Sequence, residues 1–167
     1  MGKRVLKFGE DDVGNFVGQP GRVGCIFTNG CFDILHRGHI ELFKFCRSQR
    51  VYSPVIVGIN SDKSIRKLKG RSRPIMLEED RVALLSAIQW IDFVVIFDTK
   101  SVLPLIEEIK PAILIKGGSY NTKPCTVADQ IVGQQFVENY GGKVLTGPLV
   151  EGVSSTNIIE RIKNVNK

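Results

Sequence analysis

Two kinds of hydrophobic pattern alternate along the chain. Short, nearly continuous apolar runs rich in Val, Ile and Phe are typical of strands buried on both faces of a sheet. These expected strands cover residues 23–28, 55–60, 93–97, 112–116 and 143–146. Stretches with helical spacing lie between and after them, at residues 39–49, 78–88, 102–109, 127–140 and 156–163. The pattern therefore predicts strands that alternate with helices.

This alternation predicts an α/β fold, a Rossmann-like doubly wound sheet of about five parallel strands. Ligands bind such sheets in the crevice outside the carboxyl ends of the strands, so functional residues are expected just after each strand. Residues 1–20 have weak periodicity and several glycines, and we predict an N-terminal surface arm there. Residues 21–167 are then expected to form a single domain.

Composition narrows the class of protein. The chain is 43% hydrophobic and 24% charged, as in a globular domain with a core of its own. It has neither an apolar run of about 18 residues nor a secretory signal, so a cytoplasmic location without a membrane partner is expected. The net charge of +6 favours anionic partners, which include nucleotides, sugar phosphates and nucleic acid. The four cysteines show no C-x-x-C pairing, which indicates reduced, mostly buried thiols.

Residues 28–39 follow the first expected strand and read T-N-G-C-F-D-I-L-H-R-G-H, which includes both histidines of the chain. Gly30 permits a tight turn, and His36 and His39 project from a helix start, where backbone N–H groups bind anions. The segment thus predicts a triphosphate site. A buried histidine pair and a metal site are the alternatives, but the histidines have no third ligand at a fixed spacing, so we expect no metal held by protein side chains.

The H-x-G-H signature resembles that of the cytidylyltransferase-like nucleotidyltransferases, and the longer string resembles one branch, the heptose-1-phosphate adenylyltransferases. Four further blocks agree with that branch. They are Asn60-Ser61-Asp62, Lys69-Gly70 followed by Arg73-Pro74, Lys116-Gly117-Gly118, and Glu151-Gly152 leading into S-S-T-N-I-I at 154–159. The match runs from about residue 23 to residue 162. Ser119 and Val153 depart from the usual Asp and Cys of the branch.

The resemblance implies an enzyme that transfers AMP from ATP to a sugar 1-phosphate, giving an ADP-sugar and pyrophosphate. The sugar is expected to be D-glycero-D-manno-heptose. A phosphate oxygen attacks the α-phosphorus in line, so no nucleophilic side chain is required. Mg²⁺ is expected as a cofactor bound mainly through the nucleotide phosphates. A homodimer is expected, and a separate sugar kinase upstream, because 167 residues leave no room for a fused one.

Roles for individual residues also follow from the resemblance. The expected catalytic residues are His36, His39, Lys69 and Arg73. The expected nucleotide-binding residues are Thr28, Asn29, Gly30, Cys31, Phe32, Gly38, His39, Lys116, Gly117, Ser155 and Thr156. The expected substrate-binding residues are Asp33, Asn60, Asp62, Arg73 and Arg81.

Three of these roles are more specific. The Phe32 N–H is expected to bind an α-phosphate oxygen, and Asp33 to order the turn by accepting backbone N–H groups. The basic residues between 66 and 73 are interpreted as a mobile, partly closing loop.

Two other functions compete. A cytidylyltransferase acting on glycerol 3-phosphate or an alkanolamine phosphate would share the phosphate-binding parts. A nucleic-acid-binding module could use the positive charge, with Phe27, Phe32 and Tyr52 as stacking groups. No nucleic-acid partner is expected, because such a module would not need both histidines beside a glycine turn.

Overall fold

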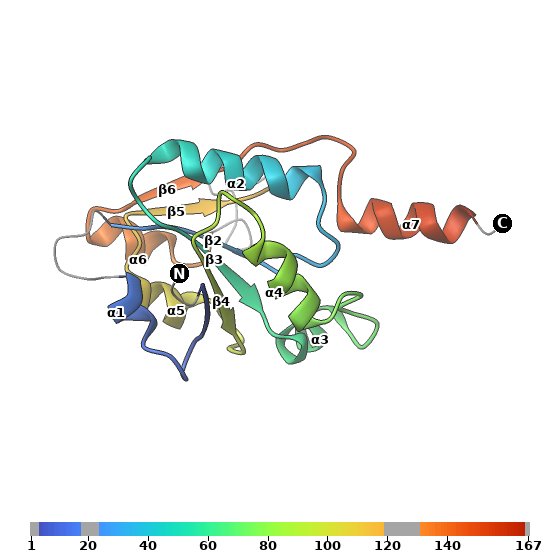
Figure 1. Ribbon diagram of the computed structural model, residues 1–167, viewed down its shortest axis with the longest axis horizontal. Coiled ribbons are helices and arrows are strands. Elements are labelled where there is room, and N and C mark those ends of the chain that lie inside the picture. Colours follow the sequence, from blue (N-terminus) through green and yellow to red (C-terminus); the bar gives the residue numbers. More distant parts are fainter. Residues whose placement is uncertain (1–3, 18–23, 119–130, 166–167) are drawn as a thin grey trace.

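A computed structural model describes residues 4–17, 24–118 and 131–165. Its strands form one parallel sheet in the order β1-β4-β3-β2-β5-β6 (Figure 1). They are β1 Val5–Lys7, β2 Ile26–Gly30, β3 Val55–Asn60, β4 Phe93–Phe97, β5 Ile113–Lys116 and β6 Lys143–Thr146. The predicted Rossmann-like α/β fold is confirmed, with six strands in place of about five.

Helices connect these strands. They are α1 Val13–Val17, α2 Arg37–Gln49, α3 Asp62–Lys69, α4 Glu78–Ser86, α5 Leu103–Ile109, α6 Gln134–Asn139 and α7 Ser155–Val165. The first part of the helix expected at 127–140 lies outside the described residues, as do Ser119 and Cys125. In the ranges that the structure describes, no helix is both long and apolar enough to cross a membrane.

The sixth strand lies in the segment expected to be an arm. Strand β1 pairs with β4, with Leu6 opposite Val95, and α1 follows it. Leu6 and Val13 are fully buried, so the described part of this segment belongs to the domain core. A strand of three residues is too short to show periodicity, which is why the hydrophobic pattern did not reveal it.

Helices cover both faces of the sheet, as a doubly wound fold requires. One apolar cluster joins β-strand residues to α1, α5 and α6, through side chains such as Val13, Leu105 and Val137. The other joins the opposite face to α2 and α4, through side chains such as Phe43 and Leu85. The sheet is thus buried on both sides, which explains the continuous apolar strands.

The chain order changes direction at β2. From β2 the chain adds β3 and β4 on one side, and then crosses to add β5 and β6 on the other side. The carboxyl ends of β2 and β5 therefore border the point where the strand order reverses, which is the place where open α/β sheets bind ligands.

Candidate active site

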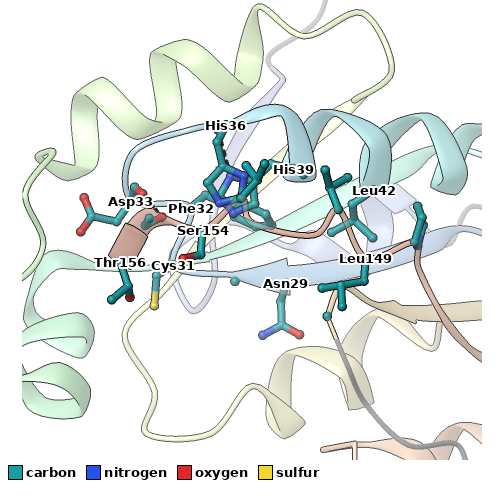
Figure 2. Close-up of a pocket in the computed structure, with 18 of the residues that line it drawn as sticks. Asn29, Cys31, Phe32, Asp33, His36, His39, Leu42, Leu149, Ser154 and Thr156 are labelled. Carbon is teal, nitrogen blue, oxygen red and sulfur yellow. Dashed lines mark hydrogen bonds between the residues drawn. The ribbon is translucent and has the colours of Figure 1, made fainter. Parts of the chain in front are cut away.

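A cavity of about 390 Å³ opens at this point of the sheet (Figure 2). Its lining comes from the end of β2 and the turn after it, the first part of α2, the end of α3 and the segment after it, the two glycines after β5, and the segment between β6 and α7 with the start of α7. The residues of that lining are Asn29, Gly30, Cys31, Phe32, Asp33, His36, Gly38, His39, Leu42, Lys69, Arg73, Gly117, Gly118, Pro148, Leu149, Val150, Val153, Ser154, Ser155 and Thr156. Segments far apart in the sequence thus converge on one cavity.

The turn after β2 is strained at residues other than glycine. Phe32 and Ile34 have φ angles of 47° and 56°, in the left-handed region that bulky side chains rarely adopt. Gly30 was expected to form this turn, but it is the last residue of β2. Its lack of a side chain serves another purpose, because a Cβ there would lie 3.2 Å from the Phe32 ring.

Asp33 holds the turn to the segment after α3. Its carboxylate accepts hydrogen bonds from Ile75 N and Met76 N at 3.0 and 2.9 Å, and from Arg73 Nη1 at 2.7 Å. Burial alone would raise the pKa of Asp33, but the N–H groups of Met76 and Ile75 and the Arg73 guanidinium lower it. Ser155 at the start of α7 donates to the Asp33 carbonyl at 2.8 Å. Asp33 therefore joins three segments of the site.

The two imidazoles of the cavity are stacked, with ring centroids 3.7 Å apart (Figure 2). His39 Nδ1 accepts a hydrogen bond from the His36 backbone N–H at 3.3 Å. In a neutral imidazole with Nδ1 as acceptor, the proton is on Nε2. The start of α2 therefore presents His39 as a neutral hydrogen-bond donor. Gly38 lies against this pair, since a Cβ there would be 3.1 Å from the His36 ring.

Protonation of this pair is unfavourable. Burial and the neighbouring His36 lower the pKa of His39 to about 4, and burial also lowers the pKa of His36. Two positive rings in stacking contact would repel each other, and the low dielectric of the site strengthens that repulsion. Near neutral pH His39 is therefore uncharged in the free protein.

This shift predicts a loss of stability in acid. The unfolded chain takes up the His39 proton near pH 6.5, whereas the native state takes it up near pH 4. The stabilisation is therefore complete above pH 6.5 and is lost as the pH falls from 6.5 towards 4. From pH 7 to pH 5 the wild type should lose about 1 to 2 kcal/mol more unfolding free energy than His39→Asn, measured in urea. Asn can still accept the His36 N–H but does not titrate, so equal losses would refute the shift.

Lys116 at the end of β5 is buried, and its ammonium group donates to the Asn29 side-chain oxygen. Burial lowers the pKa of Lys116 to about 8. Lys116 is not part of the cavity lining, whereas Asn29 is. Because the amide oxygen is engaged, Lys116 orients Asn29 with its NH₂ group free to donate elsewhere.

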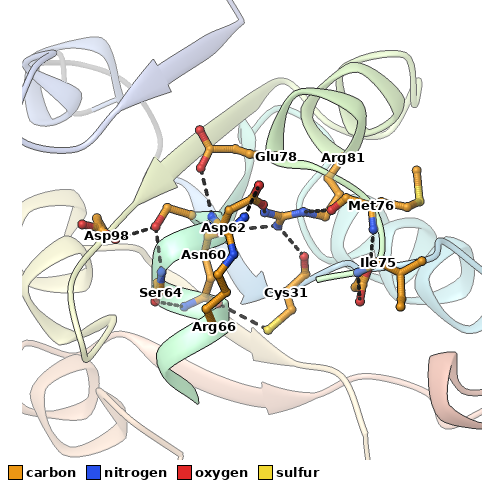
Figure 3. Close-up of polar contacts among 12 residues, drawn as sticks. Cys31, Asn60, Asp62, Ser64, Arg66, Ile75, Met76, Glu78, Arg81 and Asp98 are labelled. Atoms are coloured by element: carbon orange, nitrogen blue, oxygen red, sulfur yellow. Dashed lines mark hydrogen bonds and ion pairs between the residues drawn. The ribbon is translucent and has the colours of Figure 1, made fainter. Parts of the chain in front are cut away.

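Arg81 lies at the centre of a buried polar network beside the cavity (Figure 3). Its guanidinium donates to the carbonyls of Cys31 and Asn60 at 2.8 and 2.9 Å, and to Asp62 Oδ1 at 2.8 Å. A third carbonyl, that of Met76, accepts from Nε at 3.2 Å. Arg81 thus ties the strained turn after β2 to the end of β3 and to α4.

The basic segment between 66 and 73 differs from the expected loop. Its first half belongs to helix α3, which Ser61 caps by accepting a hydrogen bond from Ser64 N at 3.0 Å. The basic residues of this stretch obscured the helix, because helical positions 62–69 contain few apolar side chains. Lys69 and Arg73 nevertheless line the same cavity as the histidines, where they add positive charge.

Comparison with known proteins decides the family. The cytidylyltransferase-like family matches residues 27–161, which is most of the chain. The chain belongs to the cytidylyltransferase-like family. It is therefore a nucleotidyltransferase, and the resemblance carried by the H-x-G-H segment is confirmed.

Relatives of this cytidylyltransferase-like chain include the bifunctional protein HldE of Syntrophotalea carbinolica, 47% identical over 82% of this chain and 26% of the relative. The HldE protein of Geobacter sulfurreducens is also 47% identical, over the same shares. The chain thus spans about a quarter of the length of these curated relatives. A similar solved structure is the lipopolysaccharide core biosynthesis protein of Thermoplasma volcanium. It is 26% identical with a TM-score of 0.56, over 75% of this chain and 97% of that one.

Most of the expected site residues of this cytidylyltransferase-like chain do line the cavity. The expected residues outside its lining are Thr28, Asn60, Asp62, Arg81 and Lys116. Arg81 was expected to touch substrate, but its side chain is fully buried and its donors are engaged within the protein. Asp62 was expected to touch sugar hydroxyls, but it pairs with Arg81 and Arg66. The roles expected of the lining residues stay predictions.

The sequence-based prediction missed the apolar part of the lining. Leu42 comes from α2, and Pro148, Leu149 and Val150 follow β6. The rule that sites lie after strand ends could have indicated residues 148–150, because they come soon after β6.

The cytidylyltransferase-like fold also weakens the nucleic-acid alternative. Phe27 is fully buried and Phe32 is 4% exposed, so neither ring can stack on a base. Of the three aromatic residues considered, only Tyr52 is exposed.

The buried thiols are consistent with the expected reduced state, since Cys25 and Cys46 are free and burial raises the pKa of both to about 12.

Proposed function

We propose that this chain transfers AMP from ATP to a sugar 1-phosphate, with D-glycero-D-manno-heptose 1-phosphate as the acceptor. The observation that carries the proposal is the cavity, whose lining combines a neutral imidazole donor with the cationic side chains of Lys69 and Arg73. Such a set suits a polyphosphate, because N–H donors and cations stabilise charge on phosphoryl oxygens. The heptose-type blocks of the sequence and the identity to HldE proteins support the choice of substrate.

The proposed reaction needs no nucleophile from the protein. An oxygen of the sugar phosphate forms a bond to the α-phosphorus, and the bond to the bridging oxygen of pyrophosphate breaks. The attacking oxygen is already ionised, so no general base is required. Charge grows on the departing pyrophosphate, where His39 Nε2–H and the two cations of the cavity would bind it. The pair Asp33–Arg73 would hold Arg73 in place for that contact.

Mg²⁺ is proposed as the cofactor, held mainly by phosphates and water. Among the residues that the structure describes, no group of three His, Cys, Asp or Glu could hold a metal ion. Asp33 in the turn and Asp62 at the start of α3 are each paired with arginine. Bound Mg²⁺ would neutralise triphosphate charge and orient the phosphates for in-line attack.

The apolar part of the lining would hold the base. Leu42, Pro148 and Leu149 line the cavity together with Gly117 and Gly118. Gly117 packs closely against Leu42, because a Cβ there would lie 2.7 Å from Leu42 Cδ2. Gly117 and Gly118 line the cavity without side chains, so contacts to the base edge would come largely from main-chain groups there.

The acceptor must be supplied by a kinase reaction that forms the sugar 1-phosphate. The curated relatives are described as bifunctional proteins, and this chain corresponds to about a quarter of their length. We propose that the kinase activity resides outside the 167 residues of this sequence.

A matrix of substrates tests the proposed function. The purified protein is incubated with ATP, CTP, GTP or UTP, Mg²⁺, and a panel of sugar 1-phosphates, glycerol 3-phosphate and phosphocholine, and pyrophosphate is measured. ATP with the heptose 1-phosphate should give a kcat/KM at least tenfold above every other pair. Preference for CTP with glycerol 3-phosphate or phosphocholine would instead establish the cytidylyltransferase alternative. Absence of pyrophosphate with all pairs would refute both.

A further inference from the structure

Lys116 is a buried cation at the carboxyl end of β5. Its side chain is only 9% exposed. Within the part of the chain that the structure describes, no Asp or Glu forms an ion pair with it. Its ammonium group donates to the neutral side chain of Asn29. A buried charge is costly unless an opposite charge accompanies it, so Lys116 favours an anionic ligand nearby.

Lys116 and Asn29 are neighbours on one face of the sheet. Phe27 and Leu114 lie opposite each other in the parallel pairing of β2 and β5, and both belong to the apolar cluster on the side of α5 and α6. Asn29 and Lys116 come two residues later in the same strands, so they lie on the same face. The histidines belong to α2 on the other face, and Figure 2 shows the imidazoles and the Asn29 carboxamide on opposite sides of β2. The cavity therefore has hydrogen-bonding side chains on both sides of this strand.

The ammonium group decides which end of the Asn29 carboxamide is available to a ligand. An ammonium group can only donate hydrogen bonds, so its partner on Asn29 must be the oxygen. Asn29 lines the cavity, and its NH₂ group has no hydrogen-bond partner among the described residues. Burial lowers the pKa of Lys116 to about 8 against an opposing effect of Cys31, which leaves the group protonated at neutral pH. Asn29 therefore offers the cavity donors only.

We propose that Lys116 is a positioning residue for the incoming sugar phosphate: it holds the Asn29 NH₂ group available to the cavity, where this group donates to a phosphate oxygen of the acceptor. The assignment rests on the proposed function, because in an in-line displacement the attacking and leaving oxygens lie on opposite sides of the α-phosphorus. His39 binds the leaving pyrophosphate on one side of β2, which leaves the Asn29 side to the attacking phosphate. The charge of that phosphate also compensates the buried ammonium group.

A double-mutant cycle tests whether Lys116 acts through Asn29. Lys116→Met and Asn29→Ala should each raise the KM for the sugar phosphate roughly tenfold and the KM for ATP less than about threefold, because each removes one hydrogen bond to a charged acceptor. The double variant should be no weaker than Asn29→Ala by itself. An additive loss of roughly a hundredfold would show that Lys116 contacts substrate directly, and would overturn the proposal. A larger effect on the KM for ATP would also overturn it.

Asn29→Asp separates a donor from a purely structural residue. The carboxylate still accepts from Lys116, so the melting temperature should not fall, but it has no N–H group to donate. This variant should raise the KM for the sugar phosphate more than Asn29→Ala does, because a carboxylate repels the phosphate. A wild-type KM would show that Asn29 only partners Lys116, and would overturn the proposal. The matched control is Lys143→Met at the exposed start of β6, which should behave as the wild type.

NMR tests the same contact without transferase activity. The ¹⁵N side-chain NH₂ signals of Asn29, identified by their loss in Asn29→Asp, should shift when inorganic phosphate is added to the wild type. They should shift much less in Lys116→Met, because the amide is no longer held in one orientation. If the wild type releases no pyrophosphate with any substrate pair, the proposed function fails while this measurement still decides the role of Lys116. Unchanged signals in the wild type, or equal shifts in both proteins, would overturn that role.

Discussion

His39→Ala should lower the turnover number by at least tenfold, and the oxyanion-type contact it removes can contribute 10²- to 10³-fold. The imidazole lies in the cavity with Nδ1 engaged by the His36 N–H, so its remaining proton is available to a phosphate oxygen. A tenfold loss corresponds to about 1.4 kcal/mol of transition-state stabilisation, less than one charge-assisted hydrogen bond supplies. The KM for ATP should change less than the turnover number, because the charge on pyrophosphate grows in the transition state.

Two variants separate this role from a structural one. His39→Gln can place an amide N–H near the position of Nε2 and should recover part of the lost turnover. Glu41→Ala lies two residues further along α2, where Glu41 pairs with Lys44 at the surface, and it should be as active as the wild type. Wild-type turnover in a folded His39→Ala protein would contradict the assignment of His39 to the reaction.

Arg81→Met should lower the free energy of unfolding by about 3 to 5 kcal/mol, because it removes the main partner of the partly buried Asp62 carboxylate and leaves three carbonyls without their buried donor. Arg81 is fully buried and donates to Asp62, to the carbonyls of Cys31 and Asn60, and to that of Met76. For a chain of this size the melting temperature should fall by roughly 10 °C. Activity should fall by more than the loss of folded protein explains, since the Cys31 carbonyl belongs to the strained turn of the cavity.

A matched control for this variant is Arg66→Met. Arg66 pairs with the same Asp62 at 3.6 Å, but its side chain is 49% exposed. Exposed ion pairs contribute little, so this change should cost less than about 1 kcal/mol. Arg81→Lys should recover only part of the loss, because one ammonium group cannot reproduce the planar fork that reaches several acceptors. Equal melting temperatures for Arg66→Met and Arg81→Met would show that the buried Arg81 network does not contribute to the stability of the fold.

The strands were predictable where burial on both faces makes their apolar sequence continuous. The runs at 55–60, 93–97 and 143–146 match β3, β4 and β6 residue for residue. Strand β1 and helix α3 were not predictable in this way, because three residues show no period and α3 carries mostly polar and basic side chains. Both elements are defined by their neighbours: β1 by its pairing with β4, and α3 by its position after β3 and its Ser61 cap.

For the site, the sequence by itself determined which functional side chains follow the first long strand. Both histidines, the glycine that makes room for Phe32, and Asp33 lie within one segment, and their order carries the family resemblance. Local residue order also determines the spacing of His36 and His39 at a helix start, because helical geometry follows from the chain. The site could therefore be located without the fold.

Only the tertiary structure decided which side chains face the cavity and which support it. Arg81 and Asp62 carry charge in the sequence, but packing buries Arg81 and pairs the two, so they hold the strained turn. The low pKa of His39 and the link between Asp33 and residues 73–76 likewise arise from groups remote in sequence or from burial. Burial and long-range hydrogen bonds depend on how separate segments meet in space, and a linear pattern of residues does not contain that information.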